Sequence, residues 1–248
     1  MNKLKFILIA LFLFPIVIQG QTATEIVKKS DEKIRGISNY TVMTIKIVRP
    51  TWEREMKMRA WSLGTDYSMI IIDEPKRDKG TVFLKRKKEI WNWMPSIDKS
   101  IKLPPSMMMQ NWMGTDFTND DLVKQSSIVT DYTHKIVGDS VIVGMDCYKL
   151  ELIPTEDAAV VWGKLILFID KTEFLQLRVE FYDEDGYLVN LMNSYDVKEM
   201  GGRIIPAIME MIPVDTPDKK TMMIYNSIEF DIKIDEDYFT TQNMKRVR

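Results

Sequence analysis

KGTVFLKRKKEIWNWMPSIDKSIKLPPSMMMQNWMGTDFTNDDL, residues 79–122, is the stretch of this chain that decides its fold. Strand-like alternation over Thr81–Trp93 is followed by a proline-bounded run of three methionines, Met107–Met109, and then by a Gly-Thr-Asp-Phe turn at 114–117. Flexible apolar side chains are therefore concentrated between charged strands. We interpret this segment as an apolar cover beside an open sheet, a surface that suits a lipid better than a polar substrate.

Alternating strands flank the segment on both sides. Leu175, Leu177, Val179 and Phe181 point to one face of such a strand, and the acidic sequence at 183–186, which ends in Gly186, predicts the hairpin turn after it. The expected strands are Met43–Ile47, Trp52–Ala60, Tyr67–Ile72, Thr81–Lys85, Glu89–Met94, Ser100–Leu103, Tyr132–Val137, Val141–Ile153, Lys164–Asp170, Phe174–Tyr182, Leu188–Val197, Arg203–Ile212 and Thr221–Ile234. One apolar and one polar face on each strand predicts a single curved antiparallel sheet whose apolar side needs a cover.

Two segments are candidates for that cover. The first is an amphipathic helix that Thr24 can cap, that runs to about Arg35 and that stops at Gly36. The second is the region 106–123. A strongly bent sheet with a helical lid is the simplest arrangement that buries the apolar face.

The N-terminus has the layout of a secretory signal peptide. Lys3 and Lys5 precede an apolar run from Phe6 to Ile18, and the small residue Gly20 precedes Gln21. We therefore expect a signal peptide at 1–20 and a single domain at 21–248. An apolar run of this length is shorter than the roughly 18–20 residues of a membrane-spanning helix, so we expect an exported, soluble protein of the periplasm.

Charge and cysteine content restrict the function further. Without Lys3 and Lys5 the chain has 32 basic and 36 acidic residues, interspersed along its length, and this balance favours neither nucleic acid nor an anionic membrane surface as a partner. Cys147 is the single cysteine, so no internal disulfide is possible and we expect a buried structural thiol.

Catalytic and metal-binding patterns are weak. His134 is the single histidine and has no nucleophile motif near it, and we assign no catalytic residue and no cofactor. Asp116, Asp120 and Asp121 have no histidine or cysteine beside them, so we expect no metal site, and the Asp120-Asp121 pair is expected to begin a helix after Thr118. The sequence therefore favours a binding protein over an enzyme.

A cluster of large apolar residues near the lid has two interpretations. Its members can simply fill the core between the lid and the sheet, or they can line a cavity that accepts an irregular apolar ligand, because methionine side chains adapt their shape. Three consecutive methionines specify a unique packing poorly, which keeps the second interpretation open.

Several motifs resemble one known family. They are Asp73-Glu74-Pro75 through Lys79-Gly80, Leu84, Trp91 through Pro95, Ile101, Leu103 and, most specifically, Met113 through Leu122; the later segments Phe168-Ile169-Asp170, Pro206 and Thr221 also fit. This pattern is similar to the outer-membrane lipoprotein-sorting proteins, the LolA-like group, and it extends over most of the chain after residue 20. The resemblance implies a mainly β (α+β) fold: an incomplete antiparallel β-barrel of about ten to twelve strands, closed by an N-terminal helix and a helical lid.

The resemblance also implies a function. Such a protein carries acyl chains of lipoproteins or other lipids in an apolar cavity toward the outer membrane, receives them from an inner-membrane transporter and delivers them to an outer-membrane acceptor. By hypothesis the residues that line or gate the cavity are Met56, Met58, Trp91, Trp93, Met107, Met108, Met109, Trp112 and Phe117. A lipid- or peptide-sensing regulatory module of the same fold is the main alternative. An enzyme would be favoured if carboxylates such as Asp116 and Asp120 formed a pair in the cavity.

Overall fold

Thirteen antiparallel strands form one open sheet in the computed structural model, which describes residues 21–124 and 127–247. The strands are β1 (Ser38–Arg49), β2 (Trp52–Leu63), β3 (Tyr67–Glu74), β4 (Val82–Arg86), β5 (Glu89–Met94), β6 (Lys99–Lys102), β7 (Tyr132–Ile142), β8 (Met145–Pro154), β9 (Lys164–Asp170), β10 (Gln176–Tyr182), β11 (Leu188–Met200), β12 (Arg203–Pro213) and β13 (Lys220–Phe230). Their order is β6-β5-β4-β3-β2-β1-β13-β12-β11-β10-β9-β8-β7, so β6 and β7 are the two edges. The pairing of β1 with β13 joins the two halves of the chain.

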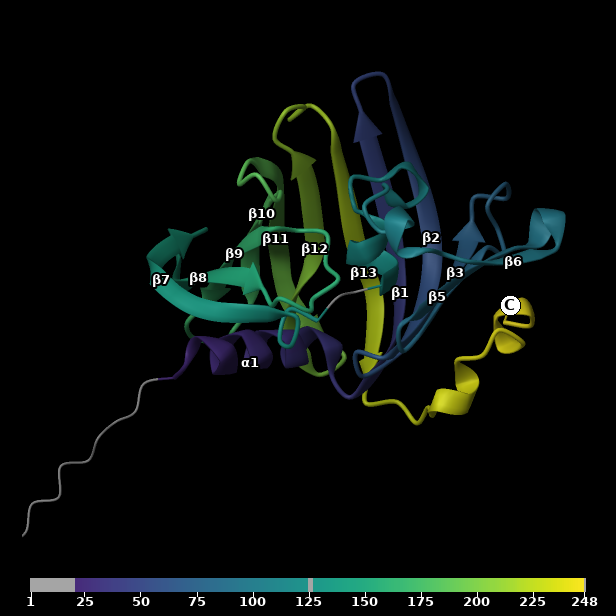
Figure 1. Ribbon diagram of the computed structural model, residues 1–248, viewed down its shortest axis with the longest axis horizontal. Helices are drawn as coiled ribbons and strands as arrows, with labels where there is room; N and C mark the ends of the chain where they lie inside the picture. Colours follow the sequence, from purple (N-terminus) through teal and green to yellow (C-terminus); the bar gives the residue numbers. More distant parts are fainter. Residues whose placement is uncertain (1–20, 125–126, 248) are drawn as a thin grey trace, which may run out of the picture.

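The sheet is strongly bent and does not close, which confirms the expected mainly β, incomplete-barrel fold (Figure 1). The number of strands is slightly above the ten to twelve expected. Two boundaries differ from the sequence-based expectation. The strand that we expected to break near residue 138 continues as β7 to Ile142, and the turn falls at Val143-Gly144. The last strand ends at Phe230, not Ile234, because the chain turns at Asp231, whose backbone has a positive φ of 55°.

Helix α1 (Ala23–Arg35) lies across one end of the bent sheet (Figure 1). Its cap is Thr22, not the expected Thr24: Thr22 Oγ1 accepts from the Glu25 N–H at 3.2 Å, and the Glu25 carboxylate accepts from the Thr22 N–H at 2.8 Å. This reciprocal pair is the capping box that an S/T-x-x-E sequence encodes. Gly36 ends the helix as predicted, with a φ of +66° that favours glycine.

Contacts to distant strands hold α1 in place. Thr24 Oγ1 lies 3.0 Å from Nδ1 of His134 on β7, and Lys33 Nζ lies 2.5 Å from the Glu173 carboxylate. Arg203 on β12 donates to the Glu32 carbonyl at 2.8 Å. The partners of α1 lie on β7, on the turn between β9 and β10, and on β12. The helix is therefore attached to several strands of the second half of the sheet.

The lid, which we define as residues 104–124, covers the concave face of the sheet. It is built of short turns instead of a regular α-helix: 3₁₀ turns at Pro105–Met107 and Trp112–Gly114, and one turn of π-helix at Asp120–Lys124. The helical start expected after Thr118 is confirmed, since Thr118 Oγ1 accepts from the Asp121 N–H at 3.1 Å and the Asp121 carboxylate accepts from the Thr118 N–H at 2.8 Å.

The C-terminal segment, residues 231–247, packs on the opposite face of the first half of the sheet, beside β5 and β6 (Figure 1). It carries two 3₁₀ turns, Glu236–Tyr238 and Asn243–Lys245, and its Phe239 and Met244 are fully buried against β3 and β4. These two strands are therefore buried on both faces. A further 3₁₀ turn, Pro95–Ile97, links β5 to β6.

The expected signal peptide at 1–20 lies outside the described residues and stays a prediction. Among the helices that the structure does describe, none combines the length and the apolar character needed to cross a membrane. Cys147 is buried on β8, in a small apolar cluster on the opposite face of the second half of the sheet.

Candidate ligand-binding site

A cavity of about 300 Å³ lies between the concave face of the sheet, the lid and α1. Apolar side chains from the middle of the sheet and from the lid form most of its wall. They include Met43, Ile45, Met58, Ile70, Leu165, Val179, Phe181, Met192, Met209, Met211 and Met223 from the sheet, and Trp112, Phe117 and Leu122 from the lid. A concave apolar site of this size lies at the lower end of the range for small-molecule pockets, about 300–1,000 Å³.

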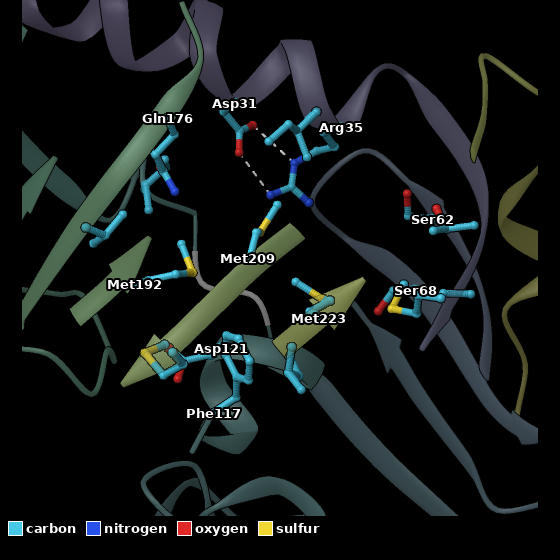
Figure 2. Close-up of a pocket in the computed structure, with 18 of the residues that line it drawn as sticks. Asp31, Arg35, Ser62, Ser68, Phe117, Asp121, Gln176, Met192, Met209 and Met223 are labelled. Carbon is cyan, nitrogen blue, oxygen red and sulfur yellow. Dashed lines mark hydrogen bonds and ion pairs between the residues drawn. The ribbon is translucent and has the colours of Figure 1, made fainter. Parts of the chain in front are cut away.

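Strand alternation explains why these residues meet. Met209 on β12 is paired with Met223 on β13, and Met192 lies on the neighbouring strand β11. Figure 2 shows the three methionines between α1 on one side and Phe117 and Asp121 of the lid on the other. The cavity floor is therefore made of flexible thioether side chains, which can adjust to ligands of different shape.

The structure brings part of the sequence-predicted set together. Met58, Trp112 and Phe117 line the cavity. Met56, Met107 and Met108 belong to the same apolar core without lining the cavity, and Met109 is 69% exposed, beside a second hollow near the 183–186 hairpin.

Trp91 and Trp93 lie on the other face of the sheet. They pack with Phe239 and Met244 of the C-terminal segment, away from the cavity. The two tryptophans share a face because they are two residues apart on β5. They lie on the face opposite the cavity because the C-terminal segment covers them there, and this segment comes more than a hundred residues later in the sequence.

Four methionines of the second half of the chain line the cavity but were not among the residues predicted to do so: Met192, Met209, Met211 and Met223. A signal was present: Met209 and Met211 alternate along one strand with Met223 opposite, so all three share one face of the sheet. The same alternation is equally typical of ordinary core residues.

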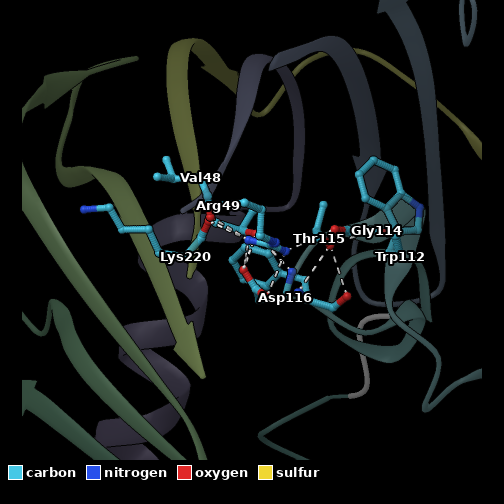
Figure 3. Close-up of polar contacts among 9 residues, drawn as sticks. Val48, Arg49, Trp112, Gly114, Thr115, Asp116 and Lys220 are labelled. Atoms are coloured by element: carbon cyan, nitrogen blue, oxygen red, sulfur yellow. Dashed lines mark hydrogen bonds and ion pairs between the residues drawn. The ribbon is translucent and has the colours of Figure 1, made fainter. Parts of the chain in front are cut away.

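The lid is attached to the sheet by a buried ion pair. Arg49 at the end of β1 donates to both carboxylate oxygens of Asp116 at 3.0 Å each, and also to the carbonyls of Gly114 at 3.2 Å and Lys220 at 3.1 Å (Figure 3). Thr221 Oγ1 donates to the Asp116 carboxylate at 2.7 Å. Bidentate guanidinium–carboxylate contacts fix both distance and orientation. The Gly-Thr-Asp-Phe turn is thereby held over the junction of β1 and β13.

Asp116 and Asp120 of the lid do not form a carboxylate pair in the cavity. Asp116 is engaged by Arg49, whereas Asp120 and Asp121 line the cavity. One Asp121 oxygen accepts from Nε1 of Trp162 at 2.9 Å and the other from the backbone of Thr118. Both oxygens of Asp121 thus serve to hold the lid turn. Within residues 21–124 and 127–247 no group of three His, Cys, Asp or Glu side chains could hold a metal ion.

Burial raises the pKa of three acidic groups around the cavity. Burial raises the pKa of Asp121 above its ordinary value of 3.8, although its hydrogen bonds from Trp162 and Thr118 act in the other direction. Burial, together with the charges of Asp120, Asp121 and Asp131, also raises the pKa of Tyr132. Burial raises the pKa of Tyr225, on the cavity wall, to about 12. The cavity is therefore a poor environment for negative charge.

We expect Asp121 to make the protein less stable as pH rises. Because the pKa of Asp121 is higher in the folded chain than in the unfolded one, its contribution is fully present below pH about 4 and is lost as pH rises through the folded pKa. The Asp121→Asn variant, which cannot ionise, should lack this loss. Urea unfolding at several values between pH 4 and pH 7 should therefore show the variant gaining stability relative to the wild type as pH rises. Asp157→Asn, at an exposed position, is the control, and a parallel pH profile for Asp121→Asn and the wild type would contradict the expectation.

Several known proteins are similar to this chain in sequence or in fold. A family model described as "Uncharacterized protein"-like matches residues 64–246, most of the chain. No curated protein matches the chain. A structure described as an outer membrane lipoprotein-sorting protein domain from Vibrio parahaemolyticus is 23% identical, with a TM-score of 0.80, 90% of this chain covered and 98% of that one.

Two further solved structures are similar. A LolA superfamily protein from Nitrosomonas europaea is 22% identical, with a TM-score of 0.78, and the match covers 90% of this chain and 99% of that one. A DUF1329 family protein from Desulfovibrio piger is 20% identical, with a TM-score of 0.79, and the match covers 90% and 97%. At these identities the three structures share the fold with this chain.

Proposed function

We propose that this chain, which shares its fold with an outer-membrane lipoprotein-sorting protein domain and a LolA superfamily protein, is a periplasmic carrier that shields the acyl chains of lipoproteins or other lipids. In this proposal the chain is exported by its signal peptide, takes its cargo at the inner membrane and releases it at an outer-membrane acceptor. It performs no bond chemistry. The single observation that carries the proposal is the apolar, methionine-lined cavity between the sheet and the lid.

Physical chemistry supports a carrier of this kind. Moving an acyl chain out of water is favourable by about 0.8 kcal/mol for each buried methylene, so even a short chain gains several kcal/mol in the cavity. The gain comes from burial alone, and release requires only that the lid moves. Lid motion would uncover Trp112 and Phe117, which are buried in the core, so a bound acyl chain that fills the cavity also keeps the lid in place.

Native mass spectrometry of the protein, purified from periplasm without detergent, tests the proposal. We expect copurified acyl lipid or acylated protein, identified after solvent extraction. A mass equal to that of the bare chain, with no uptake after incubation with lipid or acylated peptide, would count against the carrier. That outcome would favour the sensing module of the same fold.

A second test fills the cavity. Met209→Trp places a larger side chain on the cavity floor, where it displaces roughly two methylene groups of a bound chain; at about 0.8 kcal/mol each, affinity for a fluorescent acyl probe should fall roughly 10-fold. Met145→Trp makes the same chemical change in the apolar cluster on the opposite face of the sheet and should leave affinity unchanged. Equal affinity of the Met209→Trp variant and the wild type would show that the probe binds elsewhere.

A further inference from the structure

The α1 end of the cavity is polar, in contrast to its apolar body. Three neighbouring strands change from apolar to polar lining where they approach the C-terminal half of α1. The polar lining residues at this end are Ser30, Asp31 and Arg35 of α1, Asn39 and Thr41 of β1, Ser62 of β2, Ser68 of β3 and Gln176 of β10. Ser62 and Ser68 are directly paired across β2 and β3, and Figure 2 shows both to the right of Arg35, with Gln176 on the other side of Asp31. A cavity of this shape has one end for a tail and one end for a polar group.

Four of these polar groups have partners inside the protein. Arg35 donates to the two carboxylate oxygens of Asp31 at 3.0 and 3.1 Å. Asn39 Nδ2 donates to the Arg35 carbonyl at 2.9 Å, and Thr41 Oγ1 donates to the Asn39 side chain at 3.2 Å. The charges at this end therefore cancel, and its strongest hydrogen bonds are already made.

Two serine hydroxyls at this end are fully buried and have no partner. Ser30 is 3% exposed and Ser62 is 8% exposed, and neither hydroxyl has a hydrogen-bond partner. A buried hydroxyl without a protein partner is unfavourable, so such a group in a cavity wall is available to bond a ligand. Each hydroxyl can donate one hydrogen bond.

The charge balance selects the ligand class. A carboxylate or phosphate at this end would lie close to the Asp31 carboxylate, and Arg35 is already engaged by Asp31. A neutral acceptor meets no such repulsion. The ester carbonyl that joins an acyl chain to glycerol is neutral, accepts hydrogen bonds and lies at the head of an apolar tail.

We propose that the α1 end of the cavity recognises the ester group of an acylglycerol, whose carbonyl accepts a hydrogen bond from a serine hydroxyl of this end, Ser30 or Ser62. The acyl chain then runs over Met209 and Met223 toward the lid. This inference rests on the proposed carrier function, and it narrows the cargo to acyl esters. A free glycerolipid and the diacylglyceryl group of a lipoprotein present the same ester chemistry.

Competition against a bound fluorescent alkyl probe tests the inference on the full chain after the signal peptide. The competitors are matched in chain length: a monoacylglycerol, the alkylglycerol ether that lacks the carbonyl, and the free fatty acid at pH 7. We expect the ester to compete about 10-fold better than the ether, and the fatty acid to compete less well than the ester. A synthetic diacylglyceryl peptide and free diacylglycerol, each compared with its ether analogue, distinguish the two sources, and an ester preference in either pair supports the inference.

Serine variants locate the effect. In the double variant Ser30→Ala with Ser62→Ala, the ester should bind at most about twofold more tightly than the ether, while the affinity for the ether stays unchanged. Ser194→Ala is the matched control: Ser194 is 4% exposed, its hydroxyl also lacks a partner, and it does not line the cavity. An ester and an ether that compete equally with the wild type, a fatty acid that competes better than the ester, or a preference that survives the double variant would overturn the ester assignment. Failure of the alkyl probe and of every competitor to bind would instead refute the carrier function itself.

Discussion

Replacing Arg49 with alanine is expected to lower the free energy of unfolding by about 3–5 kcal/mol, because it leaves the Asp116 carboxylate buried without its counter-charge. The Arg49 and Asp116 side chains are only 12% and 6% exposed. The substitution also removes the donors to the carbonyls of Gly114 and Lys220, so the lid loses its attachment to β1 and β13. We therefore expect faster release of a bound acyl probe as well as lower stability.

Urea unfolding and stopped-flow probe release measure the two effects. Lys57→Ala is the control, since Lys57 and Glu74 form an ion pair with side chains 54% and 60% exposed, and loss of such a pair changes stability by about 0–1 kcal/mol. The double variant Arg49→Met with Asp116→Leu should recover much of the stability, because it removes the stranded charge. If Arg49→Ala lowers the free energy of unfolding by less than about 1 kcal/mol, the Arg49–Asp116 pair behaves like an exposed ion pair, contrary to the expectation.

Replacing Phe239 with alanine is expected to destabilise the protein by about 3–5 kcal/mol, the usual range for a fully buried phenylalanine. Phe239 is 0% exposed, and its ring centroid lies 5.7 Å from that of Tyr67 on β3. The Tyr67 hydroxyl also donates to the Glu236 carboxylate in the same segment. Loosening this segment uncovers the second face of β3 and β4, and this exposure adds to the loss.

The Phe239 effect is measured by urea unfolding, with hydrogen exchange of β3 and β4 as a local readout. Phe239→Leu keeps most of the apolar volume and should lose less than about 1.5 kcal/mol. Affinity for the acyl probe should change little in Phe239→Leu, because the segment lies on the face opposite the cavity. Equal stability of the alanine variant and the wild type would show that the C-terminal segment contributes no cover to the sheet.

The strands were predictable because each carries its own alternation. The alternation at Leu175–Phe181 and the Asp-Glu-Asp-Gly turn after it predicted β10 and its hairpin, which the structure confirms. The single apolar face was wrong: Leu175 and Leu177 pack with Cys147 on the face opposite the cavity, whereas Val179 and Phe181 line the cavity. The side chains change face because the pairing of β10 with β9 shifts register between Gln176 and Arg178. Turn positions were less certain: Gly138 resembled a break, but it lies at an irregularity within β7, opposite β8. Residue alternation alone cannot separate a bulge from a turn.

The site was less predictable because it depends on contacts between distant segments. Trp91 and Trp93 face away from the cavity because the segment around Phe239 and Met244 folds back over them, and no local pattern near β5 records that contact. The expectation of one apolar and one polar face on each strand is wrong for β3, which has Met69 and Ile71 buried on one face and Ile70 and Ile72 on the other; its continuous apolar run is typical of such a strand. The polar end of the cavity also depends on packing, since Asp31 and Arg35 alone form an ordinary i, i+4 ion pair.

Six methionines line the cavity: Met43, Met58, Met192, Met209, Met211 and Met223. The thioether that makes them adaptable is also the group that peroxide converts to a polar sulfoxide. Each such conversion would place a strong dipole in a wall whose use depends on its apolar character. The same side chains that allow the cavity to fit varied ligands therefore make it sensitive to oxidants, and a bound ligand that fills the cavity would protect their sulfur atoms from attack.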